Sequence, residues 1–410
     1  MVLNYIWIGF FLIAAVVALF KVILFGDFSI FPTMMKSVFD MSKTGFEISL
    51  GLAGILTLWL GIMKIGEKSG VINIFSKITG PFFSRLFPEI PKDHPSFGHM
   101  TMNFTATMLG LENAATPLGL KAMESLQEVN PNKETASNAQ IMFLVINTAG
   151  FTLLPVGIMM YRMQFGAANP SDVFIPILLT SLCATLSGII IVSVIQKINI
   201  FDKVILAYIA GIMAICASLV WYLSSKTQAQ ISYFSSVVSN LIIFGIIISF
   251  ILLGLRKKIN IYDSFIEGAK EGFATAIKII PYLIAMLVAI GVFRASGAME
   301  SILKGLSYTF NAVGINPDFV NALPTALMKP LSGSGSRGLM IDTMKTYGPD
   351  AFVSKLSCIF QSACDTTFYI VALYFGSVGI KNTRYAITCG LIADGIGIIA
   401  AIVIAKIFFI

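Results

Sequence analysis

A glycine- and serine-rich turn in the second half of the chain has the composition of an anion-binding loop. Ser332, Ser334 and Ser336 alternate with glycines, and Arg337 follows directly. Glycines let the backbone come close to a ligand, and hydroxyl groups can donate hydrogen bonds to it. At a helix start beside an arginine, such a turn suits a carboxylate or phosphate group. It is not a nucleotide-binding P-loop, because the Lys-Ser/Thr ending and the preceding strand are missing.

A second turn, at 110–119, carries an acidic residue and capping residues. Asn113 and Thr116 precede Pro117, and proline favours the first turn of a helix, so we expect these two side chains to cap that helix. Glu112 is a candidate ion ligand, since a carboxylate at membrane depth is costly unless it is paired or hydrated. The alternative is a turn exposed to water, or a Glu112 that only neutralises the arginine of the other turn.

Polar residues interrupt the apolar segments that follow both turns, at the same depth in each. A carboxylate inside an apolar segment marks an ion or proton path more often than a structural role. Hydroxyl and amide groups are candidate solute contacts, and hydrogen bonding between helices is the alternative for them. These residues, together with an aspartate in the last apolar segment, are Asn147, Thr148, Gln361, Asp365, Thr366 and Asp394.

The composition places most of this chain in lipid. Of its 410 residues, 56% are hydrophobic and only 12% are charged, about half the charged fraction of a soluble domain. The net charge of +7 comes from lysines and arginines between apolar runs, which indicates membrane flanks rather than nucleic-acid binding. Five cysteines without a Cys-x-x-Cys pair and two histidines predict neither a metal site nor any other cofactor. Serine-hydrolase and zinc-protease motifs are missing, so an enzyme is not expected.

Elements of two kinds must position these residues. Two interrupted segments, 96–127 and 318–346, have arms of about 10 residues, too short to cross about 30 Å of hydrocarbon, and we expect them to be re-entrant hairpins. Nine apolar runs reach spanning length, and the first is interpreted as a span rather than a signal peptide. The nine runs are 5–25, 46–66, 138–161, 172–196, 203–223, 232–255, 273–293, 357–378 and 385–409.

The chain repeats itself. Residues 43–46 align with 270–273 at an offset of 227, and 118–120 align with 337–339. The order of spans and hairpins also matches between the halves, while the run at 203–223 has no partner. This extra span gives an odd number of crossings between the repeats, which inverts the second one. The predicted fold is an all-α membrane protein of two inverted repeats, with domains 1–200, 201–230 (a linking helix) and 231–410.

Inverted repeats with interrupted elements at matching positions are typical of secondary transporters, although they also occur in channels. The positive charges slightly favour a cytoplasmic N terminus, with 15 lysines and arginines on its side and 12 on the other.

Long motifs carry a family resemblance. Gly-Leu-Glu-Asn-Ala-Ala-Thr-Pro-Leu-Gly-Leu-Lys-Ala-Met at 110–123 resembles the spore maturation protein A family. Pro-Leu-Ser-Gly-Ser-Gly-Ser-Arg-Gly at 330–338 and Asp-Thr-Thr-Phe-Tyr at 365–369 resemble the spore maturation protein B family, with Asp365 where that family is expected to have glutamate. The chain thus resembles a fusion of the two over nearly its whole length. The resemblance implies the gate, or nucleoside-recognition, superfamily and a multi-pass protein of the bacterial cytoplasmic membrane.

These observations predict a small-solute carrier coupled to Na⁺ or H⁺, whose site lies where the two turns and the segments after them converge. The solute would be an organic anion, a zwitterion or a nucleoside, and a homo-oligomer is compatible with the sequence. The alternative is a membrane scaffold or sensor that does not transport. The predicted solute contacts are Asn113, Thr116, Asn147, Thr148, Ser332, Ser334, Ser336, Arg337, Gln361 and Thr366, and the predicted ion-coupling residues are Glu112, Asp365 and Asp394.

Overall fold

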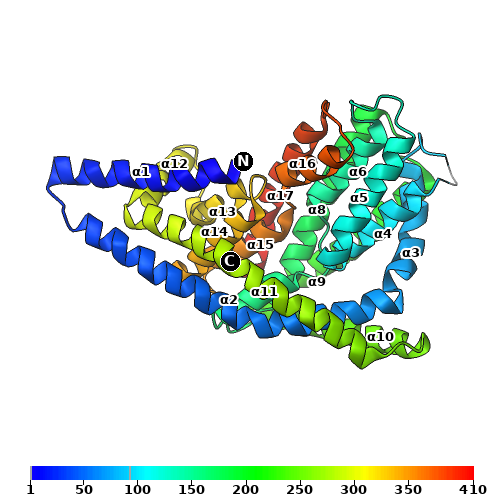
Figure 1. Ribbon diagram of the computed structural model, residues 1–410, viewed down its shortest axis with the longest axis horizontal. Coiled ribbons are helices and arrows are strands. Elements are labelled where there is room, and N and C mark those ends of the chain that lie inside the picture. The colour runs from blue at the N-terminus through cyan, green and yellow to red at the C-terminus, as the bar shows by residue number, and fades with distance from the viewer. Residues whose placement is uncertain (1, 92–93) are drawn as a thin grey trace. The chain divides into compact units, whose positions relative to one another are not determined.

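The protein is helical throughout the part that the structure describes. The computed structural model describes residues 2–91 and 94–410 (Figure 1). Within these ranges the only β pairing is an isolated bridge between Thr135 and Asn382. The all-helical fold class is therefore confirmed.

Seven segments of the described chain are long and apolar enough to cross a membrane. They match seven of the nine predicted spans, so the chain is a multi-pass membrane protein. The predicted span at 138–161 is instead divided into two helices, α6 (Asn138–Ala149) and α7 (Val156–Gln164). The span at 203–223 forms α9 (Lys203–Ser224), whose apolar part, Lys203–Leu219, is shorter than the seven.

The chain forms two compact units, each assembled from separate stretches of sequence. Unit 1 consists of Met1–Gly61, Met160–Pro170 and Ile266–Gln361. Unit 2 consists of Ile62–Met159, Ser171–Phe265 and Ser362–Ile410. Because each unit draws on both predicted repeats, the domain boundaries proposed from the sequence stay a prediction.

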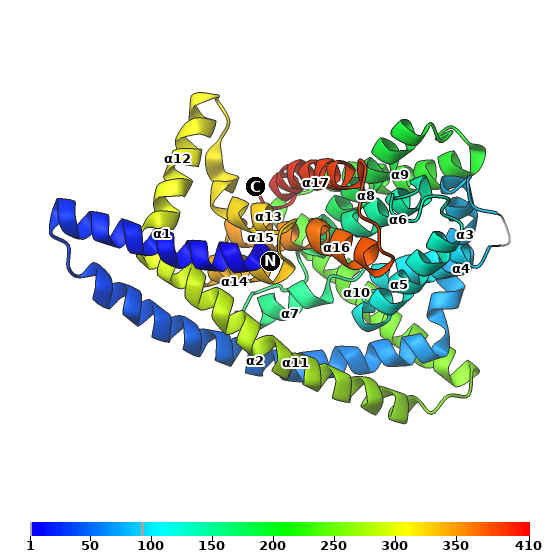
Figure 2. The ribbon, with the colours of Figure 1, turned by 45° about the horizontal axis from the view of Figure 1, so that its top comes forward.

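Unit 1 is built around two long helices, α2 and α11, which cross in an antiparallel direction (Figure 2). A Cβ at Gly45 would lie 3.1 Å from the Cα of Ile284, and one at Gly272 would lie 2.8 Å from the Cα of Thr57. The lack of a side chain at both glycines thus permits the backbones to touch. The indole of Trp7 in α1 donates a hydrogen bond to the carbonyl of Ala285 at 3.0 Å. The helices of this unit are α1 (Val2–Phe25), most of α2 (Ile30–Ser69), most of α11 (Ile261–Ala295), α12 (Ala298–Ala312), η1 (Pro317–Ala322), α13 (Leu323–Met328), α14 (Gly333–Tyr347), α15 (Phe352–Ala363) and the end of α7.

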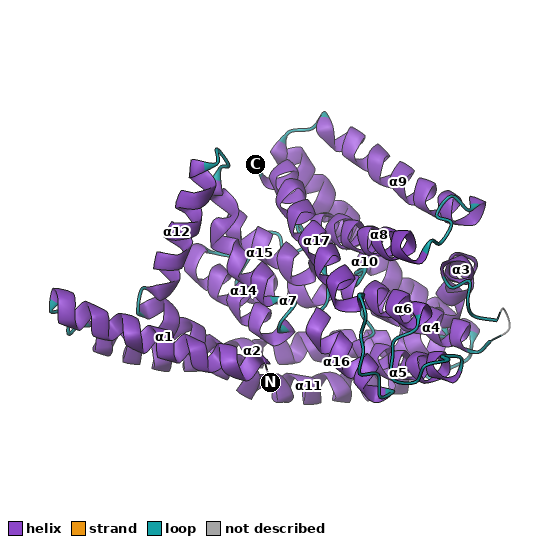
Figure 3. Ribbon diagram, turned by 90° about the horizontal axis from the view of Figure 1, so that it is seen from above, coloured by secondary structure: helices purple, strands orange, loops and turns teal. Residues whose placement is uncertain are grey.

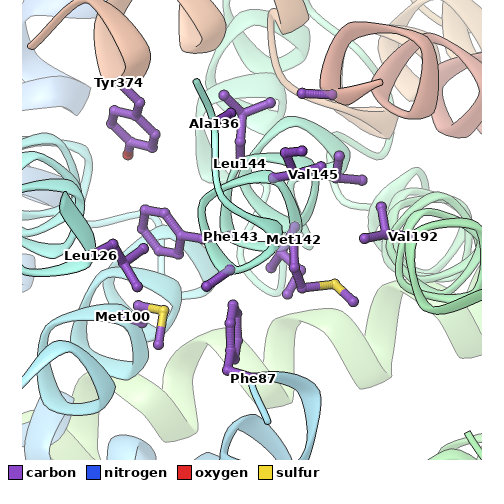
Figure 4. Close-up of a cluster of buried hydrophobic side chains, with 14 of the residues drawn as sticks. Phe87, Met100, Leu126, Ala136, Met142, Phe143, Leu144, Val145, Val192 and Tyr374 are labelled. Carbon is purple, nitrogen blue, oxygen red and sulfur yellow. The ribbon is translucent and has the colours of Figure 1, made fainter. Parts of the chain in front are cut away.

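Unit 2 holds an extensive apolar core. Phe87, Met100, Leu126 and Phe143 are fully buried there, and Figure 4 shows these side chains pointing toward one another. Helix α8 packs against both α17 and α6, and α8 and α17 lie side by side in Figure 3. The remaining helices of the unit are α3 (Val71–Leu86), α4 (Ser96–Met108), α5 (Glu112–Glu128), α8 (Phe174–Gln196), α9, α10 (Gln228–Arg256), α16 (Thr367–Ser377) and α17 (Ala386–Phe409).

The first predicted hairpin is the antiparallel pair α4 and α5 of unit 2. Its turn is tighter and earlier than predicted, because Leu111 N donates to Ala106 O at 2.8 Å and closes the chain around Gly110. Helix α5 therefore starts at Glu112, and Pro117 lies inside it. The prediction that Asn113 and Thr116 cap a helix starting at Pro117 is wrong, since both lie within α5 and its cap position is Leu111.

Candidate functional site

Helix α6 ends abruptly in the middle of unit 2. Gly150 takes a left-handed conformation, with φ 51°, and Pro155 follows five residues later. The segment between them is not helical, so the last carbonyls of α6 have no intrahelical partners. A Cβ at position 150 would also lie 3.2 Å from the backbone nitrogen of Asp365. Glycine is required here both by the backbone angle and by the close approach.

A second interrupted helix meets the first at this point. The chain is not helical between α15 and α16, at 364–366. Asp365 N donates to Thr148 O at 2.7 Å, and one Asp365 carboxylate oxygen accepts from Thr366 N at 2.7 Å. An offset of 217 between the two predicted repeats places Thr148 over Asp365, and these two residues are in direct contact. Unit 2 therefore brings the carboxylate of Asp365 to the C-terminal end of α6.

Two uninterrupted helices supply further polar groups to these breaks. The Thr185 hydroxyl in α8 donates to Ala149 O at 3.4 Å, and the Thr367 hydroxyl donates to the buried carboxylate of Asp394 in α17 at 2.6 Å. An offset of 209 likewise places Thr185 over Asp394 in the two predicted repeats. Asp394 is thus linked through Thr367 to the helix break that carries Asp365, and the ion-coupling role predicted for both carboxylates stays a prediction.

A polar network that the sequence did not reveal connects the first hairpin to α6 and α16. Asn103 Nδ2 in α4 donates to Ala115 O at 2.8 Å and to the Tyr374 hydroxyl at 3.3 Å. Tyr374 in turn donates to Asn147 Oδ1 at 3.5 Å. The side chain of Asn147, which was predicted to contact the solute, is therefore hydrogen-bonded to another side chain of the protein. Asn103 and Tyr374 were missed because Asn103 lies among several other polar residues of α4, and Tyr374 is an aromatic residue in a mostly apolar helix.

In unit 1, the serine-rich turn forms the start of α14. Ser332 is the N-cap, and its hydroxyl accepts a hydrogen bond from Gly335 N at 3.0 Å. Ser334 lies 3.3 Å from the Ser332 hydroxyl, whereas the buried Ser336 donates to Thr325 O at 2.7 Å. The prediction of a glycine–serine turn feeding a helix start is confirmed. Ser336 faces the other arm of the hairpin, so the groups at the start of α14 are Ser332 and Ser334.

Two predicted side chains accompany this helix start. The guanidinium of Arg337 lies over the ring of Tyr161, 5.9 Å from its centre, which is cation–π geometry. Gln361, at the end of α15, donates from Nε2 to Gly333 O at 3.3 Å. The carbonyl oxygen Oε1 of Gln361 is buried and has no hydrogen-bond partner within the described residues.

The predicted site residues fall into both compact units. The structure describes the backbone of Glu112 and Asn113, whose side chains lie outside its described part, and it places Thr116 on the exposed side of α5. Asn147, Thr148, Asp365, Thr366 and Asp394 come together in unit 2, and Ser332, Ser334, Arg337 and Gln361 come together in unit 1. That these two groups converge on one site stays a prediction.

Unit 1 also contains an ionic cluster that sequence reasoning missed. Arg294, at the end of α11, donates to both carboxylate oxygens of the buried Asp342, with Nη2 2.5 Å from Oδ2, and Nη1 lies 3.1 Å from Glu300. The only signal in the sequence was an aspartate within an otherwise apolar helical turn. Within the described residues, no group of three or more His, Cys, Asp or Glu side chains could hold a metal ion.

Seven helical segments of spanning length, with two interrupted helices that meet at polar groups, define a polytopic helical membrane protein. Comparison with known families agrees. The sequence pattern of the Gate family, described as nucleoside recognition, matches residues 49–165 and 276–381. The chain belongs to this family.

Two relatives from Bacillus subtilis (strain 168) are similar to parts of the chain. Spore maturation protein B is 44% identical over 179 residues, covering 44% of this chain and 97% of that protein. Spore maturation protein A is 40% identical over 188 residues, covering 46% of this chain and 92% of that protein. The resemblance to both spore maturation families is thereby confirmed. No solved structure matches the chain.

Proposed function

We propose that this protein is an ion-coupled carrier for a small organic solute with an anionic group. The observation that carries the proposal is the contact between the two interrupted helices, where Asp365 N bonds to Thr148 O at 2.7 Å. Helices broken at membrane depth expose backbone groups that are tolerated only where they are buried in protein or line a cavity. Carriers use such breaks to bind ions and solutes.

The ion would bind in unit 2. The C-terminal end of α6 presents carbonyl groups and the negative end of a helix dipole, which favour a cation. Asp365 adds a carboxylate at this end, and Asp394 adds a second one that is bonded to Thr367. Oxygen ligands of this kind suit Na⁺, and the same carboxylates could carry a proton instead. A nitrogen- or thiolate-preferring metal fits less well, because neither histidine nor cysteine is among these ligands.

The solute would bind at the start of α14 in unit 1. Its first N–H groups have no intrahelical acceptor, and the positive end of the helix dipole lies there. Ser332, Ser334 and the guanidinium of Arg337 add donors and charge that suit a carboxylate or phosphate. A nucleoside would find hydroxyl and amide groups here but no use for the positive charge.

An inverted duplication is part of the proposal. Adding the offset of 227 to Gly45 and Thr57 gives Gly272 and Ile284. The contact of Gly45 with Ile284 and the contact of Gly272 with Thr57 are therefore the same contact with the two repeats interchanged. A two-fold axis across an antiparallel pair of helices produces this pattern. It supports two inverted repeats and, through them, two re-entrant hairpins rather than four further spans.

The second candidate is a membrane scaffold or sensor that retains the fold without transporting. The names of both relatives, spore maturation proteins, favour it at least as much as they favour a carrier. We propose the cytoplasmic membrane of a bacterium as the location for either function, with the N terminus in the cytoplasm.

A flux assay separates the two candidates. Purified protein in liposomes should accumulate a labelled organic anion, amino acid or nucleoside when a Na⁺ or H⁺ gradient is applied, and protein-free liposomes should not. Asp365→Asn should remove the dependence on the ion gradient, whereas Asp365→Glu should keep it because the carboxylate is retained. Arg337→Gln should weaken uptake of an anion without unfolding the protein. If Asp365→Asn and Arg337→Gln both take up solute like the parent, the charges of Asp365 and Arg337 have a structural role only. If the parent takes up no solute, the result favours the scaffold.

A further inference from the structure

Helix α9 connects the two predicted repeats and has no counterpart in the second one. It lies between the two matched regions of the Gate family, residues 49–165 and 276–381. The two similar proteins reported above are separate chains, and each matches less than half of this chain over nearly its own length. Sequences similar to the repeats therefore exist without the connection that α9 makes.

In unit 2 the repeats meet where α8 packs against α17. A Cβ at Gly188 of α8 would lie 3.4 Å from the Cβ of Ala393. A Cβ at Gly397 of α17 would lie 3.1 Å from the Cβ of Ala184. An offset of 209 relates the two alanines and also the two glycines, so these are the same contact with the repeats interchanged. Each helix thus presents an Ala-x-x-x-Gly face, which lets helices approach closely in a membrane.

Unit 1 contains a crossing of the same kind, between α2 of the first repeat and α11 of the second. Gly45 and Gly272 permit the two backbones to touch there. Elsewhere in this unit, the fully buried guanidinium of Arg162, at the end of α7, donates to Pro349 O at 2.7 Å and to Asp350 Oδ1 at 3.3 Å. Both compact units are therefore closed by contacts between the repeats.

Main-chain hydrogen bonds join two loops of different repeats in unit 2. The loop between α5 and α6 belongs to the first repeat, and the loop between α16 and α17 belongs to the second. Lys381 N and Asn382 N donate to Glu134 O at 2.9 and 3.0 Å. Ala136 N donates to Asn382 O at 3.0 Å, and the guanidinium of Arg384 donates to Ala136 O, also at 3.0 Å. Because hydrogen bonds are directional, these contacts select one alignment of the repeats.

The contact between the two helix breaks favours a pair of unlike repeats. Thr148 and Asp365 are aligned and bonded to each other, so they lie close to the two-fold axis that relates the repeats. Two copies of the second repeat would bring Asp365 against a second Asp365, and two carboxylates so close cannot both be charged without a large cost. Thr148 in the first repeat removes this repulsion. The second repeat therefore fits the first better than it fits a copy of itself.

We propose that the chain is a covalently joined heterodimer, in which each repeat presents a surface that fits the other and the two stay together when the connection is cut. The partner that either surface fits is a chain of one repeat's length with the same fold. Helix α9 then serves to invert the second repeat during synthesis and is not what holds it. The inference uses the inverted duplication proposed above, but it applies to a carrier and to a scaffold alike.

Cutting the intact protein tests the proposal. A protease recognition sequence is inserted between Ser225 and Lys226, in the loop after α9, and the full chain is purified in a neutral maltoside detergent by a tag on its N terminus before it is cut. The untagged fragment should stay bound to the tagged one and elute with it in size-exclusion chromatography. Because cutting makes the contact bimolecular, the melting temperature of the cut protein should fall on dilution, whereas that of the uncut protein should not.

Two glycines of α17 provide matched variants. Gly397→Leu adds a side chain against Ala184, whereas Gly395→Leu adds the same side chain where nothing lies within 4 Å of the new Cβ. After cutting, Gly397→Leu should raise the dissociation constant of the fragments about 10- to 100-fold, and Gly395→Leu should leave it unchanged. Before cutting, the connection should keep both variants assembled, because it holds the repeats at a high effective concentration. If uncut Gly397→Leu does not fold, Gly397→Ala tests the same contact with a single methyl group.

Mixing two preparations that carry different tags on the second repeat tests the preference for unlike repeats. After cutting, the two tags should be recovered together no more often than in the uncut mixture, which controls for any oligomer of the whole chain. Recovery of both tags together only after cutting would contradict the preference.

The proposal is overturned when the fragments of the cut parent separate under conditions that keep the uncut protein folded, or when Gly397→Leu and Gly395→Leu hold their fragments equally well. Fragments that stay together in a protein without flux would leave this inference standing and remove the carrier. Flux in the uncut protein, with fragments that separate after cutting, would do the reverse.

Discussion

The second arms of the two hairpins occupy matching places in the sequence, yet different forces hold them. The alignment of Leu118 with Arg337, an offset of 219, places Met123 of α5 over Asp342 of α14 and Leu126 over Lys345. In unit 2 the two apolar side chains are fully buried in the core. In unit 1, Asp342 is held by Arg294, and Lys345 donates to the Thr44 hydroxyl of α2 at 2.6 Å.

This difference determines which substitutions each hairpin can tolerate. Apolar packing is insensitive to salt and loses stability in proportion to the atoms removed. An ionic clamp depends on both partners, because removing one leaves the other buried and unpaired. The hairpin of unit 1 is therefore the one that a single charge change can release, and it also contains the turn that we propose to bind an anion.

Arg294→Met should cause the largest loss of stability. It leaves the buried carboxylate of Asp342 without its partner, and we expect a loss of about 3–5 kcal/mol in the free energy of unfolding. The measurement is denaturation of the purified protein in detergent. The double change Arg294→Met with Asp342→Leu should recover most of this loss. A double variant as unstable as the single one would show that the clamp is not what holds α14.

Met123→Ala tests the apolar counterpart. Removing most of a fully buried methionine side chain should cost about 2–4 kcal/mol, somewhat less than the loss of Arg294. The same denaturation experiment applies, repeated at low and high salt. We expect the cost to be the same at both, and a strong salt dependence would contradict the comparison of the two arms.

Lys345→Met should have a smaller effect. Its ammonium bonds to the Thr44 hydroxyl at an exposed position, and such bonds contribute about 1 kcal/mol or less. Hydrogen exchange of α14 is the more sensitive measurement, since it reports local opening rather than global unfolding. Faster exchange confined to α14 would support the clamp, whereas unchanged exchange would assign the attachment to Asp342 alone.

The smallest effect that we expect is a dependence of stability on pH, caused by His99 in the first hairpin. Burial, followed by the nearby charge of Lys121, lowers the pKa of His99, whose Nδ1 lies 2.7 Å from the Ser125 hydroxyl. Because the folded state resists protonation, stability should be present above the ordinary pKa of about 6.5 and decline as the pH falls below it. Glu124, Glu128 and His94 also face this group. His99→Asn should flatten the melting temperature between pH 7.5 and 5, and an unchanged slope would assign it to other groups.

The helical class, seven spans and both turns were predictable because lipid imposes a simple rule on them. A helix must be apolar for about 20 residues to cross the hydrocarbon, and such runs are visible in the sequence. The division of 138–161 into α6 and α7 was not predicted, although Gly150 and Pro155 both lie within that run. Apolar content hides a break, because hydropathy averages over the very residues that interrupt the helix.

Candidate site residues could be picked out from the sequence where they were conspicuous. Asp365, Asp394 and the serine turn stand out as polar groups among apolar neighbours. Asn103, Tyr374 and Arg294 did not stand out, because their importance comes from partners more than 40 residues away.

The interleaving of the two units in the sequence determines when each unit can be completed during synthesis. Unit 1 begins with residues 1–61 but needs residues up to 361, and unit 2 ends with the last residue of the chain. Neither can be completed while the ribosome is still translating the first half. The helices that are synthesised first therefore lie in the membrane without their final partners until much later in translation. During this interval α2 has no α11 to cross, and the face around Gly45 that α11 later contacts has no partner from that helix.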